Sequence, residues 1–210
     1  MAFVVAAVQA AYVLLDRDAT VARVETLTAE AAGQGAALVV FPEAFIPGTP
    51  LWIDSVPVWD GDGPWYARLV DQSVVVPGPT TERLGRAARS HGVHLVIGVQ
   101  EREPHGTTVY NTVLYFGPDG RLLSKHRKLV PTGSERTVWG QGDGSTLEAV
   151  PTALGRLGGL ICWETTCRSH ASISMPRGSR CGSRRRWLAA TGGSPRCGTS
   201  PARAGCGWSA

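Results

Sequence analysis

The chain has 210 residues, of which 43% are hydrophobic, and a formal net charge of +4. This length suffices for one domain with a sizeable core. Residues 165–210 hold eight Arg and no acid, whereas residues 1–164 hold 13 Lys and Arg against 17 Asp and Glu. The larger part is therefore acidic, which argues against the nucleic-acid or anionic-surface binding that the overall charge would suggest.

The N-terminal segment, residues 1–8, is apolar but lacks the basic stretch of a secretory signal. No segment approaches the roughly 18 uninterrupted apolar residues that suggest a membrane span. We therefore expect no membrane association, and a cytoplasmic protein whose thiols are reduced.

Apolar runs alternate with amphipathic segments along the first hundred residues. Three apolar runs predict buried strands: Phe3–Val8, Ala36–Phe41 and Val93–Val99. Two segments with apolar residues three or four positions apart predict helices: Asp18–Gln34 and a segment from Thr80 or Thr81 to about His91. Residues 46–79, rich in Pro, Gly and Trp, predict a functional loop with a short helix near Tyr66–Gln72.

Residues 108–162 predict a hairpin and one further strand. Thr108–Phe116 and Arg121–His126 flank the turn sequence Gly-Pro-Asp-Gly, which is typical of a hairpin. A polar loop, Leu129–Gly144, follows, and then the apolar run Leu154–Cys162 predicts another strand. Helices alternating with apolar strands indicate an α/β layered fold.

Three reactive side chains follow predicted strands. Glu43 comes after the second strand, Lys128 after the hairpin, and Cys162 at the end of the last strand. Each alone has a structural explanation: an acid starting a helix, a solvated charge and a small buried thiol. Their shared position at strand ends favours a functional site, because α/β folds build their sites at that edge.

This set of residues suits covalent catalysis. A cysteine attacks as a thiolate, so it needs a base, and a nearby carboxylate can take its proton. A lysine can then hold the negative charge that develops on the substrate. Residues 1–164 contain no spacing of Cys and His that is typical of a zinc site, so we expect neither a metal nor a cofactor.

Four motifs resemble the nitrilase superfamily of carbon–nitrogen hydrolases. They are Phe41–Phe45, Lys125–Thr132, the segment from Glu135 to Gly144, and Gly159–Glu164. The Cys-Trp-Glu of the last motif is similar to the true nitrilase branch, whereas amidase branches usually show Cys-Tyr-Asp. The resemblance covers about residues 3–164.

The resemblance implies an α-β-β-α sandwich, here incomplete, and a mechanism. Cys162 would be the nucleophile, Glu43 the general base, Lys128 the stabilising cation and Glu135 a second glutamate that positions groups and water. The backbone N–H of Trp163 would be a further stabilising donor. The implied reaction converts a small nitrile to a carboxylic acid and ammonia through a thioimidate and a thioester. An intact relative would be a homo-oligomer.

Three alternatives remain open from the sequence. The first is an amidase-type hydrolase, because amide hydrolysis shares the thioester half of the reaction. The second is an inactive, truncated pseudo-enzyme. The third is a binding protein that uses its basic tail.

Residues 165–210 break the pattern. Only two of them are branched aliphatic, and Arg, Ser and Gly make up half, so this stretch predicts disorder. Restoring one base after codon 164 lets the same stretch be read as an amphipathic helix and two apolar strands. We therefore hypothesise two regions: residues 1–164, the N-terminal part of a hydrolase domain, and residues 165–210, an out-of-frame tail.

Overall fold

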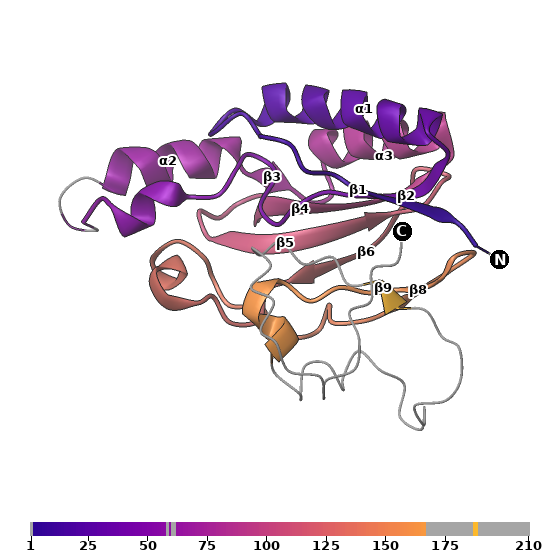
Figure 1. Cartoon of the computed structure of the whole chain (residues 1–210). Coiled ribbons are helices and arrows are strands. Elements are labelled where there is room, and N and C mark those ends of the chain that lie inside the picture. The colour runs from indigo at the N-terminus through magenta and orange to yellow at the C-terminus, as the bar shows by residue number, and fades with distance from the viewer. Residues whose placement is uncertain (1, 58, 60–61, 167–186, 189–210) are drawn as a thin grey trace, which may run out of the picture.

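The computed structural model describes residues 2–57, 59, 62–166 and 187–188. Its centre is a mixed sheet in the order β1-β2-β4-β5-β6, with the short β3 also paired to β4 (Figure 1). Pairing is parallel between β1, β2 and β4, and antiparallel from β4 to β6. The strands are β1 Val4–Ala7, β2 Ala36–Val40, β3 Val74–Val75, β4 His94–Arg102, β5 Val109–Phe116 and β6 Leu122–Arg127.

Two helices cover one face of this sheet (Figure 1). They are α1, Arg17–Gly33, and α3, Pro79–His91. The side chain of Asp16 caps α1 by accepting a hydrogen bond from the backbone N–H of Ala19 at 2.9 Å. Apolar side chains of both helices pack on the sheet in one buried cluster that includes Val21, Val24, Leu84, Val39, Leu95 and Ile97. The predicted helices and first strands are confirmed to within a few residues.

The opposite face of the sheet carries a second layer. It contains a small sheet of β7, Val150–Thr152, β8, Gly155–Leu157, and β9, Trp187–Leu188. Leu157 and Ile161 pack against inward side chains of the main sheet, among them Leu38, Val96 and Val113. The described residues therefore stack as helices, main sheet and second layer, which confirms the α/β layered class.

One predicted strand is wrong. Leu154–Cys162 is not a continuous strand, because only Gly155–Leu157 pairs with its neighbours. The described strand pairings do not include residues 158–161, and Cys162 begins the 3₁₀ helix η3, Cys162–Thr166. Two consecutive glycines, Gly158 and Gly159, have no side chains to pack on a sheet, which weakens strand formation after Leu157.

The predicted tail lies outside the described residues except for positions 165–166 and 187–188. Its proposed disorder and the boundary at residue 164 therefore stay predictions. Within the described residues, none of the helices is both long and apolar enough to cross a bilayer.

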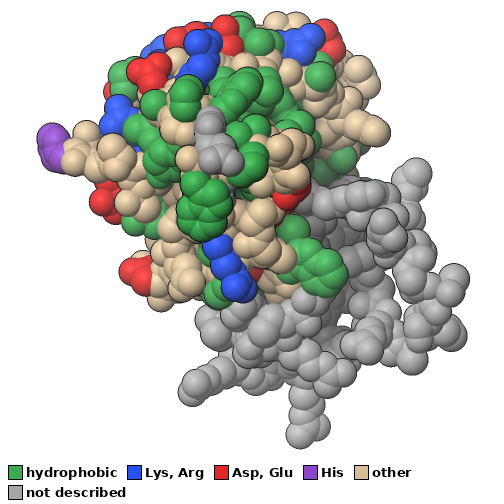
Figure 2. All heavy atoms as spheres, turned by 90° about the vertical axis from the view of Figure 1, so that its left-hand side faces the viewer, with side chains coloured by type: hydrophobic (Ala, Val, Ile, Leu, Met, Phe, Trp, Pro, Cys, Tyr) green, Lys and Arg blue, Asp and Glu red, His purple; other side chains and the backbone are tan. Residues whose placement is uncertain are grey.

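Residues 46–79, the segment predicted as a functional loop, contribute to a second buried apolar cluster. The 3₁₀ helix η1, Leu51–Asp54, places Trp52 in a stack on Trp65 of α2, Asp62–Gln72, with ring centroids 5.7 Å apart. Trp52 is buried with Ala44 and Trp139, so this core lies directly behind the segment that follows β2. Hydrophobic side chains also gather on the outer surface of this side of the molecule (Figure 2), and Leu51 and Trp65 reach solvent there.

Candidate active site

Glu43 lies on a segment that leaves β2 and runs along β4. The backbone of Gly98 in β4 donates to the carbonyl of Pro42 at 3.1 Å and accepts from Ile46 N–H at 3.2 Å. A Cβ atom on Gly98 would lie 2.5 Å from both Pro42 O and Ala44 N. The glycine therefore permits the close approach that fixes the backbone of Glu43.

This approach gives a stability prediction. We expect Gly98→Ala to lower the free energy of unfolding by about 1–3 kcal/mol, since the new methyl group meets backbone atoms that cannot move freely. Gly33→Ala is the matched control: its Cβ meets nothing within 4 Å. Urea unfolding of both variants measures the difference. Equal midpoints for both would show that the Gly98 contact is not tight.

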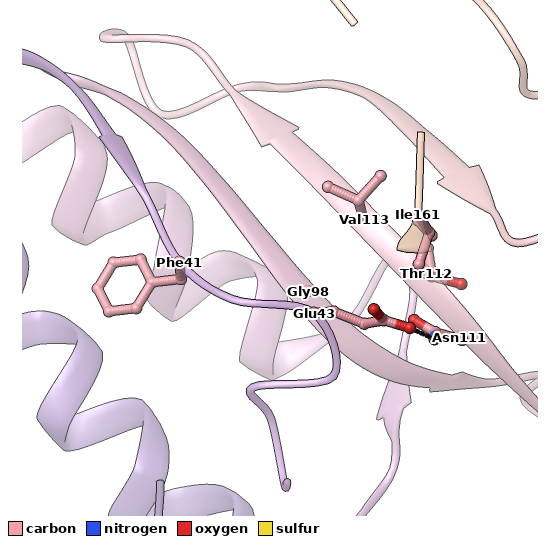
Figure 3. Close-up of a pocket in the computed structure, with 7 residues that line it drawn as sticks. All are labelled: Phe41, Glu43, Gly98, Asn111, Thr112, Val113 and Ile161. Atoms are coloured by element: carbon pink, nitrogen blue, oxygen red, sulfur yellow. Dashed lines mark hydrogen bonds between the residues drawn. The ribbon is translucent and has the colours of Figure 1, made fainter. Parts of the chain in front are cut away.

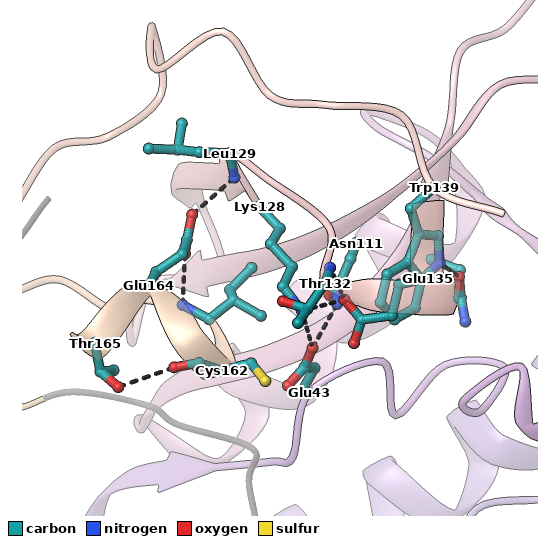
Figure 4. Close-up of polar contacts among 12 residues, drawn as sticks. Glu43, Asn111, Lys128, Leu129, Thr132, Glu135, Trp139, Cys162, Glu164 and Thr165 are labelled. Atoms are coloured by element: carbon teal, nitrogen blue, oxygen red, sulfur yellow. Dashed lines mark hydrogen bonds and ion pairs between the residues drawn. The ribbon is translucent and has the colours of Figure 1, made fainter. Parts of the chain in front are cut away.

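Lys128 follows β6 directly, and its side chain is buried at the centre of the site (Figure 4). Its backbone N–H donates to Asn111 O at 2.8 Å, which extends the β5–β6 pairing by one residue. Its ammonium donates to Glu135 Oε2 at 2.7 Å and to Glu43 Oε1 at 3.2 Å. Lys128 therefore joins the two carboxylates.

Glu135 is held by its own loop. It lies in the 3₁₀ helix η2, Gly133–Thr137, and its Oε2 accepts a hydrogen bond from the backbone N–H of Thr132 at 2.7 Å. Further along, Trp139 places its ring 5.3 Å from the Lys128 ammonium, and Gly142 N–H donates to Lys128 O at 2.9 Å. This loop, predicted as polar and as the carrier of Glu135, therefore closes around Lys128.

Cys162 stands at the start of a tight turn with a φ of 55°, in the left-handed region that non-glycine residues seldom occupy. Such strain is typical of functional positions. Its sulfur points toward Glu43 (Figure 4), and Cys162 Sγ and one oxygen each of Glu43 and Glu135 lie within 4.8 Å of one another. The structure therefore brings together the four predicted catalytic residues, although the first and the last of them are far apart in the sequence. They are Glu43, Lys128, Glu135 and Cys162.

The charges of the site are shifted by burial. Burial raises the pKa of Glu43, and Lys128 and Asn111 lower it without cancelling that effect. Burial would lower the pKa of Lys128, but attraction to Glu43 and Glu135 outweighs it and the pKa is raised. Glu43 is thus a carboxylate of increased basicity beside a firmly protonated lysine, as a general base requires.

Burial also raises the pKa of the Cys162 thiol, and the charge of Glu43 raises it further. Lys128 and the backbone N–H of Trp163 act in the opposite direction. The resting thiol is therefore protonated, and its proton has Glu43 as a nearby acceptor. Trp163 is 64% exposed, and it is its backbone N–H that acts on Cys162.

Both hydrogen bonds to Glu43 fall on one oxygen. Asn111 Nδ2 donates to Oε1 at 2.6 Å, the same atom that Lys128 contacts. In the described part of the chain Oε2 has no assigned hydrogen bond, so it is available to take a proton. A small pocket borders this carboxylate (Figure 3), and Phe41, Gly98, Val113 and Ile161 are among the residues that line it.

The ligand atoms of Glu43, Glu135 and Cys162 are close enough to hold a metal ion. The Lys128 ammonium, however, already forms ion pairs with both carboxylates. A metal ion there would have to lie beside that fixed positive charge, which disfavours it. The donor set therefore fits acid–base chemistry better than metal binding.

Two further residues shape the site and carried no assigned role in the sequence. Asn111 is an ordinary β5 residue, and only the strand register reveals that it faces Glu43. Glu164 was visible as the last residue of the Cys-Trp-Glu motif, but two of its partners, Leu129 and His126, lie 35 and 38 residues away in sequence.

Comparison with known proteins gives consistent matches. The family model described as carbon–nitrogen hydrolase matches residues 4–180. The chain is 47% identical to Nitrilase 1 of Arabidopsis thaliana over 161 residues, 75% of this chain and 46% of that protein. It is 44% identical to a nitrilase of Bacillus sp. (strain OxB-1) over 164 residues, 76% and 46% of the two chains. A bifunctional nitrilase/nitrile hydratase of Lupinus angustifolius is 47% identical, with 75% and 46% covered.

The fold is also similar to solved structures. Saccharomyces cerevisiae Nit3, a member of branch 10 of the nitrilase superfamily, superposes with a TM-score of 0.68 at 25% identity, covering 89% of this chain and 63% of that one. An amidase from Nesterenkonia sp. gives 0.62 at 20% identity, covering 89% and 64%. This chain spans about half the length of the curated relatives above. By the family model and the shared fold, the chain belongs to the carbon–nitrogen hydrolase family.

Proposed function

We propose that this chain carries the catalytic residues of a nitrilase, which hydrolyses a small nitrile to a carboxylic acid and ammonia. The observation that carries the proposal is the cluster of Cys162, Glu43 and Glu135 around the buried Lys128 ammonium. The nitrilases that match at 44–47% identity support it.

In the first half of the reaction, Glu43 takes the thiol proton of Cys162 as the sulfur attacks the nitrile carbon. An S–C bond forms, the C≡N triple bond becomes C=N, and the proton passes from Glu43 to the nitrogen, giving a thioimidate and restoring the Glu43 carboxylate. Lys128 and the Trp163 backbone N–H supply positive charge where the nitrogen develops negative charge. No co-reactant is needed for this step.

In the second half, water adds to the thioimidate carbon and gives up a proton to Glu43. The nitrogen leaves as ammonia after accepting protons, and a thioester remains. A second water hydrolyses the thioester, which releases the carboxylic acid and restores the Cys162 thiol. Glu135, hydrogen-bonded to Lys128, would orient that lysine and the incoming water.

Amide release is the second candidate outcome. If sulfur leaves in place of ammonia after the first water adds, the product is an amide. The bifunctional nitrilase/nitrile hydratase among the relatives supports testing for it. Hydrolysis of amides as the main activity is favoured less, because the relatives at 44–47% identity are nitrilases.

The test is ammonia release from a panel of aliphatic, aromatic and arylacetonitriles and the corresponding amides, with acid and amide products separated by chromatography. We expect the folded chain to release ammonia and acid, and Cys162→Ala to release neither. Sole turnover of amides would support the amidase alternative. A well-folded sample that is inert toward the whole panel would support the inactive pseudo-enzyme.

The proposal extends to the setting of the enzyme. Thiols are kept reduced in the cytoplasm, which suits a catalytic cysteine, so we propose this compartment. We propose a homo-oligomer without nucleic-acid or membrane partners, and a small-molecule nitrile as the substrate.

We also propose that residues 165–210 are an out-of-frame tail that follows a domain portion at residues 1–164. Sequencing the DNA around codon 164 would decide this.

A further inference from the structure

The carboxylate of Glu164 is buried and fully engaged, although it does not contact the reactive sulfur. It is 4% exposed. Its Oε1 accepts a hydrogen bond from the backbone N–H of Leu129 at 2.7 Å, and its Oε2 accepts one from the backbone N–H of Ile161 at 2.6 Å. His126 Nε2 lies 3.1 Å from the same Oε2. The Glu164 carboxylate thus contacts three groups, two backbone N–H groups and one imidazole.

The two backbone partners are the immediate neighbours of reactive residues. Leu129 follows Lys128, and Ile161 precedes Cys162. Figure 4 shows the carboxylate of Glu164 reaching between these two segments. It therefore bridges the strand end that carries the lysine and the turn that carries the cysteine, across 35 residues of sequence.

The bridge acts on a segment that is packed on the main sheet through Ile161 but is not paired as a strand. Residues 158–161 have no strand partner among the described pairings, and Cys162 adopts a φ of 55°. Within the turn, Glu164 N–H donates to Ile161 O at 3.2 Å and Thr165 Oγ1 donates to Cys162 O at 2.9 Å. A strained residue keeps its conformation only when its surroundings hold it there.

Glu164 is held as an anion. Burial raises the pKa of its carboxyl, but His126 and the backbone N–H groups of Leu129 and Ile161 outweigh burial and lower it. The charges that most affect the pKa of Cys162 are those of Glu43, Lys128 and Glu135. The hydrogen bonds of Glu164 act on the backbone that leads into Cys162.

We propose that Glu164 is a positioning residue, whose buried carboxylate fixes the Cys162 turn to the end of β6 and so holds the sulfur within reach of Glu43. The proposal rests on the proposed role of Cys162 as the nucleophile. It also explains why His126 and Glu164 stand inside the two motifs that bear Lys128 and Cys162.

The test is Glu164→Gln in the full chain. The amide keeps the shape of the side chain, but its NH₂ group faces one of the two backbone N–H donors, so one half of the bridge breaks. The energy of a hydrogen bond to a charged group corresponds to a factor of about ten or more. We expect kcat to fall by a factor of that size. KM should change much less, because the Glu164 carboxylate is buried and bonded to protein groups.

A second readout is independent of nitrile turnover. Iodoacetamide alkylation of Cys162, followed by site-resolved mass spectrometry against pH, reports the thiol alone. We expect the midpoint of this profile in Glu164→Gln to shift to lower pH, because a loosened turn exposes the thiol that burial now holds at a raised pKa. Glu164→Asp keeps the charge but is too short to span both N–H groups, so it should behave like Glu164→Gln.

Glu101→Gln is the matched control. Glu101 is an equally buried carboxylate that binds Lys125, Arg127 and Thr112 and does not contact the site. The Glu101→Gln substitution should lower the melting temperature without shifting the alkylation profile of Cys162. A folded Glu164→Gln whose kcat and alkylation profile both match the wild type would overturn the proposal. A wild-type chain without nitrile turnover would count against the proposed function, and the alkylation profiles would still test the bridge.

Discussion

Glu43→Gln is expected to lower kcat by about 10²–10⁴-fold, the usual contribution of a general base. The amide oxygen can still accept from Asn111 and Lys128, as Oε1 does now at 2.6 Å and 3.2 Å, so the geometry should survive. The proton acceptor for Cys162 is then lost while its surroundings remain. Single-turnover measurements of thioimidate formation would separate this loss from effects on binding.

The same variant should not lose stability at neutral pH. The folded-state pKa of Glu43 is raised, so between the ordinary carboxyl pKa and the raised value the folded protein binds more protons than the unfolded chain. Stability contributed by this group is therefore present at low pH and lost as pH rises through that window. Glutamine removes the loss, so we expect equal or higher stability at neutral pH together with low activity.

The pH–rate profile supplies the matching control. In the wild type the rate should fall on the acid side as Glu43 becomes protonated, at a pH above the ordinary carboxyl range. That acid limb should disappear in Glu43→Gln. An unchanged limb in the variant would assign the base role to another group.

Lys128→Met is expected to cost both activity and stability. The buried ammonium is the partner of two partly buried carboxylates, Glu43 and Glu135, and its removal leaves them facing each other. Breaking a buried ion pair by removing one partner costs about 3–5 kcal/mol of unfolding free energy. Loss of a preorganised positive charge at the reacting atoms should also lower kcat by about 10²–10³-fold.

Lys125→Met is the matched control, because it removes the same side chain three residues away. Lys125 pairs with Glu101, which keeps Arg127 as a second partner at 2.6 Å. We expect a small stability loss and nearly unchanged kcat. The Lys128→Met defect in stability should shrink at acid pH, where the carboxylates are protonated. A defect that is constant with pH would mean that lost packing, not repulsion, is responsible.

The local patterns of the sequence predicted most of the fold. Short-range periodicity placed α1 and α3 within two residues, and the Gly-Pro-Asp-Gly turn placed the β5–β6 hairpin. Because Lys128 directly follows a strand and Glu43 follows another, their convergence was also predictable. The strand Leu154–Cys162 was not, since an apolar run indicates burial and does not reveal whether a pairing partner exists.

The supports of the site could not be predicted, because they depend on register and on long-range contacts. Asn111 reaches Glu43 across 68 positions, and Glu164 meets His126 across 38. Neither separation leaves a periodic signal. The left-handed conformation of Cys162 is equally invisible in the residue itself, since only the surrounding backbone imposes it.

The ion-pair cluster around Lys128 has a consequence for the end of the proposed reaction. One ammonium faces the carboxylates of Glu43 and Glu135, so with both ionised the centre has an excess of negative charge. A nitrile is neutral and enters without electrostatic cost. The carboxylate that leaves would be a third anion beside a single cation, and repulsion would drive it out. The arrangement proposed to activate the thiol would therefore also favour release of the product.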